Sequence, residues 1–142
     1  MAYTGLVNDA PFEEVEHTAD WALRARGGDL ASLMVNAARG MLSLMQVVPA
    51  PGPRRWTSLT LQAGDPAALL VRWLEELLFR METRGVAFTD FHVALPDSQT
   101  LQATVEETGI ASMGHGIKAV TYHGLQVEST PAGVQATIVF DV

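Results

Sequence analysis

The chain has 142 residues, of which 48% are hydrophobic and none is cysteine. A chain of this length is expected to form a single domain, residues 1–142, that buries roughly 70% of the surface of its unfolded form and needs no disulfide. Sixteen acidic and nine basic residues give a net charge of −7, which repels phosphate backbones and argues against autonomous binding of RNA or DNA. Without thiolates, any bound metal must take oxygen or imidazole ligands.

No apolar run approaches the roughly 18 residues that a membrane span needs, so the sequence predicts a soluble protein without a membrane partner. The N-terminal segment lacks the basic region and the long apolar region of a secretory signal. We therefore expect a cytoplasmic protein in which residues 1–10 form a frayed N-terminus.

The first third of the chain is predicted to hold two strands and a helix. Residues 12–16 and 21–26 have the composition of strands, and the second run alternates apolar and polar side chains. Two glycines end this strand. Asp29 can then cap the N-terminus of a helix over residues 30–46, in which apolar residues recur at helical spacing.

A proline-rich segment follows the first helix. Residues 48–55 contain three prolines, which remove backbone donors, so the segment is predicted to be an irregular surface connector. A strand over residues 56–63 comes next. Asp65 and Pro66 then give a strong N-terminal signal for a second helix, whose broad apolar stripe ends before Gly85, a typical left-handed C-cap.

Short strands are predicted in the remainder of the chain, at residues 86–95, 101–107, 117–122, 124–129 and 134–142. The glycine-rich residues 108–116 lack the spacing of a phosphate-binding loop and are interpreted as a flexible turn. Together these elements predict an α+β fold, a two-layer sandwich of mainly antiparallel strands with two amphipathic helices packed on the sheet.

Two aspartates near opposite ends of the chain are the strongest candidates for chemistry. In the last strand, Phe140 and Val142 share the predicted core face, which turns Asp141 to the other side. Asp20 is likewise opposed to Trp21. If the two strands are neighbours, both carboxylates reach one surface and can share a cation. The alternative is a pair of solvated carboxylates that never meet.

Hard divalent cations prefer about six to eight oxygen ligands, drawn from carboxylates, carbonyls and water. Asp20, Asp141 and the main chain of Val142, which as the last residue also offers an α-carboxylate, would supply only part of such a shell. The sequence therefore indicates a weak, hydrated cation site unless a partner completes it.

Three segments resemble the archease family: residues 17–20 (His-Thr-Ala-Asp), residues 117–123 (Ile-Lys-Ala-Val-Thr-Tyr-His) and residues 139–142 (Val-Phe-Asp-Val). They occur in the family's order, and the likeness extends from about residue 12 to the end. The resemblance implies a small cytoplasmic accessory protein that activates an RtcB-type RNA ligase in tRNA splicing or RNA repair. It would promote guanylylation of the ligase's active-site histidine and multiple turnover, without being an enzyme itself.

By the same resemblance, the metal site of the family corresponds to Asp20, Asp141 and the backbone of Val142. Calcium is the expected cation, with magnesium and manganese as the alternatives. Lys118 matches a lysine of the family's central motif and is expected to contact the ligase or its nucleotide phosphates; the alternative is a lysine on a solvated strand face. Two histidines of the matching motifs are interpreted as structural residues outside the metal shell: His17 and His123.

Two other functions stay open. The protein could instead be a chaperone-like modulator of another RNA-processing enzyme, such as a tRNA methyltransferase, or a metal-dependent hydrolase that uses the aspartates. The hydrolase is disfavoured because no general base, nucleophile or oxyanion-stabilising group accompanies the aspartates in the sequence. In the preferred interpretation the partner is the ligase, RNA is met only through it, and the protein is a monomer.

Overall fold

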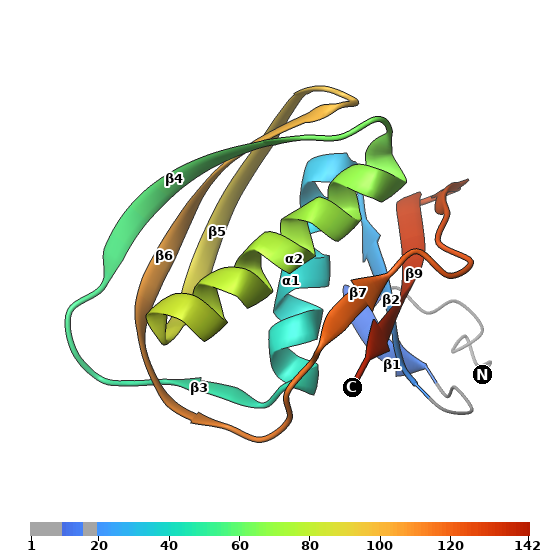
Figure 1. Ribbon diagram of the computed structural model, residues 1–142. Coiled ribbons are helices and arrows are strands. Elements are labelled where there is room, and N and C mark those ends of the chain that lie inside the picture. The colour runs from blue at the N-terminus through green and yellow to red at the C-terminus, as the bar shows by residue number, and fades with distance from the viewer. Residues whose placement is uncertain (1–9, 16–19) are drawn as a thin grey trace, which may run out of the picture.

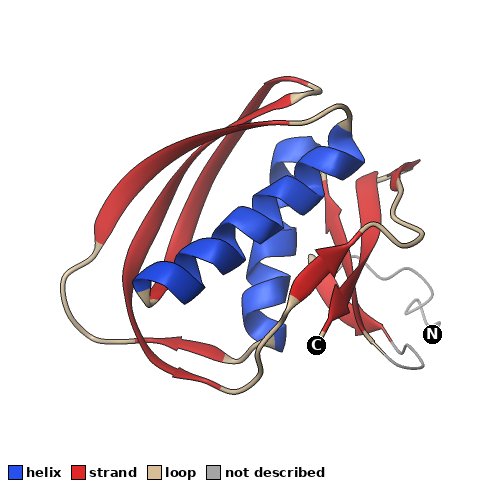
Figure 2. Cartoon of the chain, in the orientation of Figure 1, coloured by secondary structure: helices blue, strands red, loops and turns tan. Residues whose placement is uncertain are grey.

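The computed structural model describes residues 10–15 and 20–142, so residues 1–9 of the predicted frayed N-terminus lie outside the described residues. Figure 1 shows two antiparallel sheets with two helices between them. Figure 2 shows the same layers by secondary structure, in the order sheet, helices, sheet. The predicted α+β sandwich is confirmed, but its strands are divided between two sheets, one on each side of the helices, so it has three layers where two were predicted.

The first sheet is built from both ends of the described chain. Its strands are β1 Phe12–Val15, β2 Trp21–Gly27, β7 Ala119–Thr121, β8 Val127–Thr130 and β9 Gly133–Asp141. Their order is β1-β2-β9-β7, and β8 also pairs with β9. All of these pairs are antiparallel. Strand β9 is therefore the centre of the sheet, because it contacts β2, β7 and β8.

The second sheet is formed by consecutive strands from the middle of the chain. Its members are β3 Val47–Pro49, β4 Arg55–Gln62, β5 Val86–Asp97 and β6 Thr100–Met113. The long strand β6 pairs with each of the other three in antiparallel fashion. This sheet covers the face of the helices opposite to the first sheet (Figure 1).

Two predictions for this sheet are wrong. Residues 48 and 49 of the predicted connector belong to the short strand β3, and residues 108–113, predicted as part of a flexible turn, continue β6. The two segments support each other, since the Ala50 amide donates to the Gly109 carbonyl at 2.8 Å and the Thr108 hydroxyl donates to the Pro53 carbonyl at 3.3 Å. Proline is tolerated here because β3 lies at the edge of the sheet.

The helices begin where the sequence predicts. In α1, Leu30–Leu44, the Asp29 carboxylate accepts from the Ser32 amide at 2.8 Å; in α2, Pro66–Arg84, the Asp65 carboxylate accepts from the Ala68 amide at 2.8 Å. Helix α2 ends at Gly85, whose φ of 64° is the expected left-handed cap. Neither helix is long and apolar enough to cross a membrane, within residues 10–15 and 20–142.

The core lies on both sides of the helix layer. Trp73 of α2 is fully buried, and its indole N–H donates to the Met34 carbonyl of α1 at 2.8 Å. Helix α1 approaches β2 closely at Gly40, where a Cβ atom would lie 2.7 Å from a methyl of Leu23 and 2.9 Å from the Phe12 ring. This close approach explains a glycine in the middle of a helix, where it is otherwise unfavourable.

The N-cap of α1 gives a stability prediction. Asp29→Ala is expected to lower the free energy of unfolding by about 1 kcal/mol near neutral pH, whereas Asp29→Asn keeps a cap acceptor and should cost little. The hydrogen bond from the Ser32 amide lowers the pKa of Asp29. The ionisation-linked part of its stabilisation is therefore complete above the unfolded-state pKa and is lost as the pH falls through the lowered folded-state pKa.

Thermal unfolding of the three proteins between about pH 7 and about pH 2 checks this. The difference between wild type and Asp29→Ala should shrink toward acid, while the difference between the asparagine and alanine variants should not. If the stability difference between wild type and Asp29→Ala were the same at every pH in this range, the charged cap would be contradicted.

Candidate functional site

The two predicted aspartates lie at the same end of the first sheet. The ladder between β2 and β9 ends with Trp21 opposite Phe140. Asp20 directly precedes Trp21 and Asp141 directly follows Phe140, so the antiparallel register, carried one residue further, places Asp20 opposite Asp141. The alternative of two carboxylates at unrelated places on the surface is thereby disfavoured.

The predicted alternation of β9 fails at Val139, which is buried although it shares the parity of Asp141. Ile138 and Phe140 are fully buried, and Asp141 is exposed. Asp20 is half-buried. The prediction that Val142 shares the core face is wrong: the residue is 41% exposed, because it lies beyond the last ladder pair of β9. This exposure leaves Val142 at the surface beside Asp141.

Lys118 joins the same sheet end from the other side of β9. Its main-chain amide donates to the Asp141 carbonyl at 2.7 Å, and Ala119, the next residue, pairs with Asp141 in the β7–β9 ladder. The Lys118 side chain is exposed. The structure thus gathers the four predicted residues from three neighbouring strands, β2, β9 and the entrance to β7.

The structure describes one of the two histidines of the matching motifs. His17 lies outside the described residues. His123 is exposed beyond the end of β7, and its main-chain amide donates to the Thr121 hydroxyl at 3.3 Å. Sequence reasoning missed one histidine, His115, whose ring contacts Trp21. No sequence signal pointed to this contact, because the two residues come from opposite ends of the chain.

The donor atoms at this sheet end suit a hard divalent cation. Asp20 and Asp141 offer carboxylate oxygens, and the main chain of Val142 offers further oxygen, which is the chemistry that calcium, magnesium and manganese prefer. Within the part of the chain that the structure describes, no three side chains of His, Cys, Asp or Glu are grouped to hold a metal ion. The described donors therefore fit part of a coordination shell, which water or further oxygen ligands would complete.

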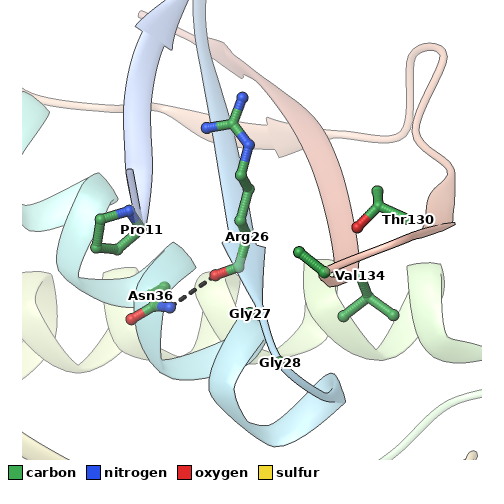
Figure 3. Close-up of a pocket in the computed structure, with 8 residues that line it drawn as sticks. Pro11, Arg26, Gly27, Gly28, Asn36, Thr130 and Val134 are labelled. Atoms are coloured by element: carbon green, nitrogen blue, oxygen red, sulfur yellow. Dashed lines mark hydrogen bonds between the residues drawn. The ribbon is translucent and has the colours of Figure 1, made fainter. Parts of the chain in front are cut away.

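A pocket lies at the opposite end of β2 and β9 (Figure 3). Its lining includes Arg26, Gly27, Gly28, Asn36 and Thr130. The side-chain amide of Asn36 donates to the main-chain carbonyl of Arg26 at 2.6 Å. The Arg26 guanidinium is engaged by Glu13 at 2.8 Å and by the Ala10 carbonyl at 3.2 Å. The hydrogen bond from Arg26 is the main reason that the pKa of Glu13 is lowered. This arginine therefore fastens β1 to β2.

Comparison with known proteins places this geometry in a family. Residues 12–142 match the Archease protein family (MTH1598/TM1083). The chain is 32% identical over 147 residues to protein archease of Methanopyrus kandleri, covering 93% of this chain and 99% of that protein. It is also 32% identical over 136 residues to protein archease of Saccharolobus islandicus, covering 92% and 98%.

Solved structures agree with the fold. The solution structure of Methanobacterium thermoautotrophicum protein 1598 superposes with a TM-score of 0.68 at 28% identity, over 93% of this chain and 99% of that one. A Thermotoga maritima crystal structure, described as an archease and a possible chaperone, gives a TM-score of 0.67 at 21% identity, over 92% and 96%. Since the family match spans nearly all of the described residues and curated relatives match over nearly their full lengths, the chain belongs to the archease family.

Proposed function

We propose that this protein activates an RtcB-type RNA ligase, as a non-catalytic partner that promotes guanylylation of the ligase's active-site histidine and multiple turnover in tRNA splicing or RNA repair. The observation that carries the proposal is the meeting of Asp20, Asp141, Val142 and Lys118 at one end of the first sheet. Family membership over residues 12–142 supports it.

In this proposal the sheet end binds a divalent cation, calcium by preference and magnesium or manganese as alternatives. Asp20 and Asp141 hold the ion with help from Val142, and an open coordination shell leaves room for oxygens from the ligase or its nucleotide. When bound, the ion supplies positive charge for phosphate oxygens. The exposed Lys118 directly precedes the neighbouring strand β7 and adds a second cationic contact for the same phosphates.

Charge also supports a protein partner. The net charge of −7 favours approach to a basic surface, and an RNA ligase must carry a basic cleft for its substrate. RNA is then met only through the ligase, and the protein acts as a cytoplasmic monomer.

The test is ligation by the cognate ligase with and without this protein, at a ligase concentration well below that of the RNA. We expect product in excess of ligase only when the protein is present, and faster labelling of the ligase with a guanine nucleotide. Equal product and equal labelling in both reactions would reject the activation of a ligase.

A second candidate is a chaperone-like modulator of another RNA-processing enzyme, such as a tRNA methyltransferase. The description of the Thermotoga maritima relative as a possible chaperone favours it. This candidate predicts that the protein protects such an enzyme from thermal aggregation and leaves the yield of the ligation reaction unchanged. The ligation reactions with and without the protein therefore distinguish the two candidates.

A further inference from the structure

His115 makes a ring contact beside the proposed cation site. The rings of His115 and Trp21 are 4.9 Å apart, centre to centre, at an interplanar angle of 85°, which is the edge-to-face arrangement that aromatic rings favour. Trp21 is the first residue of β2, is half-buried and packs against the core. The contact therefore joins an exposed loop residue to the strand end that carries Asp20.

The loop that carries His115 is fixed at both ends. The main-chain amides of Gly114 and His115 both donate to the Met45 carbonyl at 3.0 Å, at the C-terminus of α1. A Cβ atom at Gly114 would meet the Gln46 side chain, so this part of the loop packs closely on the C-terminus of α1. At the other end, the Lys118 amide donates to the Asp141 carbonyl at 2.7 Å. The backbone of the loop is therefore tied by hydrogen bonds on both sides of the His115 ring.

The geometry points to a positioning role, and this inference rests on the proposed function of the site: we propose that His115, through Trp21, fixes the end of β2 and so holds Asp20 opposite Asp141. The β2–β9 ladder ends at Trp21, and Asp20 lies one residue beyond it. The placement of Asp20 therefore depends on how firmly Trp21 is held. The ring of His115 provides that hold from outside the sheet.

His115 acts in this proposal through Trp21 and not as a ligand. Within the described residues, no three side chains of His, Cys, Asp or Glu are grouped to bind a metal, so His115 does not complete a set with the two aspartates. The same loop also delivers Lys118 to the other side of Asp141. The loop that is hydrogen-bonded to α1 therefore contacts both sides of the proposed site, at Trp21 next to Asp20 and at Asp141.

Terbium luminescence tests the proposal with the metal alone. Tb³⁺ replaces Ca²⁺ at oxygen sites and emits when a nearby indole is excited, and Trp21 is adjacent to Asp20 in the chain. We expect His115→Ala to weaken Tb³⁺ binding by about tenfold, the lower end of the range for losing a group that orients a metal ligand, because His115 acts on Asp20 only through Trp21. His115→Phe keeps a ring against Trp21 and should restore the affinity. Competition by Ca²⁺ confirms that both ions use one site.

A matched control is available in the second sheet. The ring of His92 lies 4.9 Å from that of Trp56, centre to centre, and both residues are exposed on strands that do not reach the proposed site. His92→Ala removes the same side chain from the same kind of contact and should leave Tb³⁺ affinity unchanged. Circular dichroism of all variants verifies that each is folded.

The outcomes separate this inference from the function on which it rests. If wild type does not bind Tb³⁺, the proposed cation site is wrong and the positioning role falls with it. If wild type and His115→Ala bind equally, the site stands and the positioning role is overturned. If the alanine and phenylalanine variants are equally weakened, an imidazole nitrogen is required and His115 is not a positioning residue.

Discussion

Asp141→Ala is expected to abolish the stabilisation of the protein by Ca²⁺. A ligand that binds only the folded state at about 100 times its Kd adds about 2.7 kcal/mol, or about 8 °C in Tm for a chain of this size. In the proposed site Asp141 supplies one of the two carboxylates, so its loss should remove nearly all of this shift. Thermal unfolding with Ca²⁺ and with a chelator measures it, and Asp20→Ala should behave in the same way.

Glu128→Ala is the matched control for this experiment. Glu128 is also an exposed acid of the first sheet, but it pairs with Gln135 at the far end of β9. Its removal changes the net charge equally and should preserve the Ca²⁺ shift. A wild-type protein whose Tm does not respond to Ca²⁺, Mg²⁺ or Mn²⁺ would remove the cation from the proposal.

The same variants separate two roles for the cation. If the ion only joins the ends of β2 and β9, Asp141→Ala should still activate the ligase at a temperature where the variant is folded. If the ion acts on the ligase or its nucleotide, Asp141→Ala should fail to activate the ligase. In the presence of a chelator, the Tm values of this variant and of wild type should nevertheless be similar.

Trp73→Ala is expected to lower the free energy of unfolding by about 4 kcal/mol, which corresponds to about 12 °C in Tm. Trp73 is fully buried between the helices and the second sheet, where its ring also lies edge-on to Phe91 at 5.9 Å. Its removal leaves a large cavity and deprives the Met34 carbonyl of the indole donor. Denaturant unfolding followed by circular dichroism measures the change.

Two further variants calibrate this result. Trp56→Ala removes an indole that is 45% exposed and should change the free energy of unfolding by less than about 1 kcal/mol. Trp73→Phe keeps most of the buried ring but loses the hydrogen bond to Met34, and should fall between the other two. Equal effects of Trp73→Ala and Trp56→Ala would contradict the placement of the core.

Local signals in the sequence predict the helices well. Asp29, Asp65 and Gly85 act within one turn of their helix, so their chemistry is visible without knowledge of distant contacts. The end of α1 is less well predicted, because the apolar pattern continues to Met45. Gln46 adopts a left-handed φ of 52° and the helix stops at Leu44.

Contacts between distant segments explain what the sequence could not predict. Strand parity predicted that Asp20 and Asp141 face the same way, but only the pairing of β2 with β9 makes them neighbours. Strand β3 forms because it pairs with β6, and the prolines of the segment argued against a strand there. The contact between His115 and Trp21 depends on the path of a whole loop, which periodicity cannot reveal.

The central position of β9 has a consequence for synthesis on the ribosome. The second sheet uses only strands between Val47 and Met113, so its hydrogen bonds can form while the rest of the chain is still being made. The first sheet cannot close until β9 emerges and pairs with β2. Since Asp141 is the last residue of β9, the proposed cation site can assemble only after β9 has been synthesised, and a nascent chain that lacks β9 cannot present it to a partner.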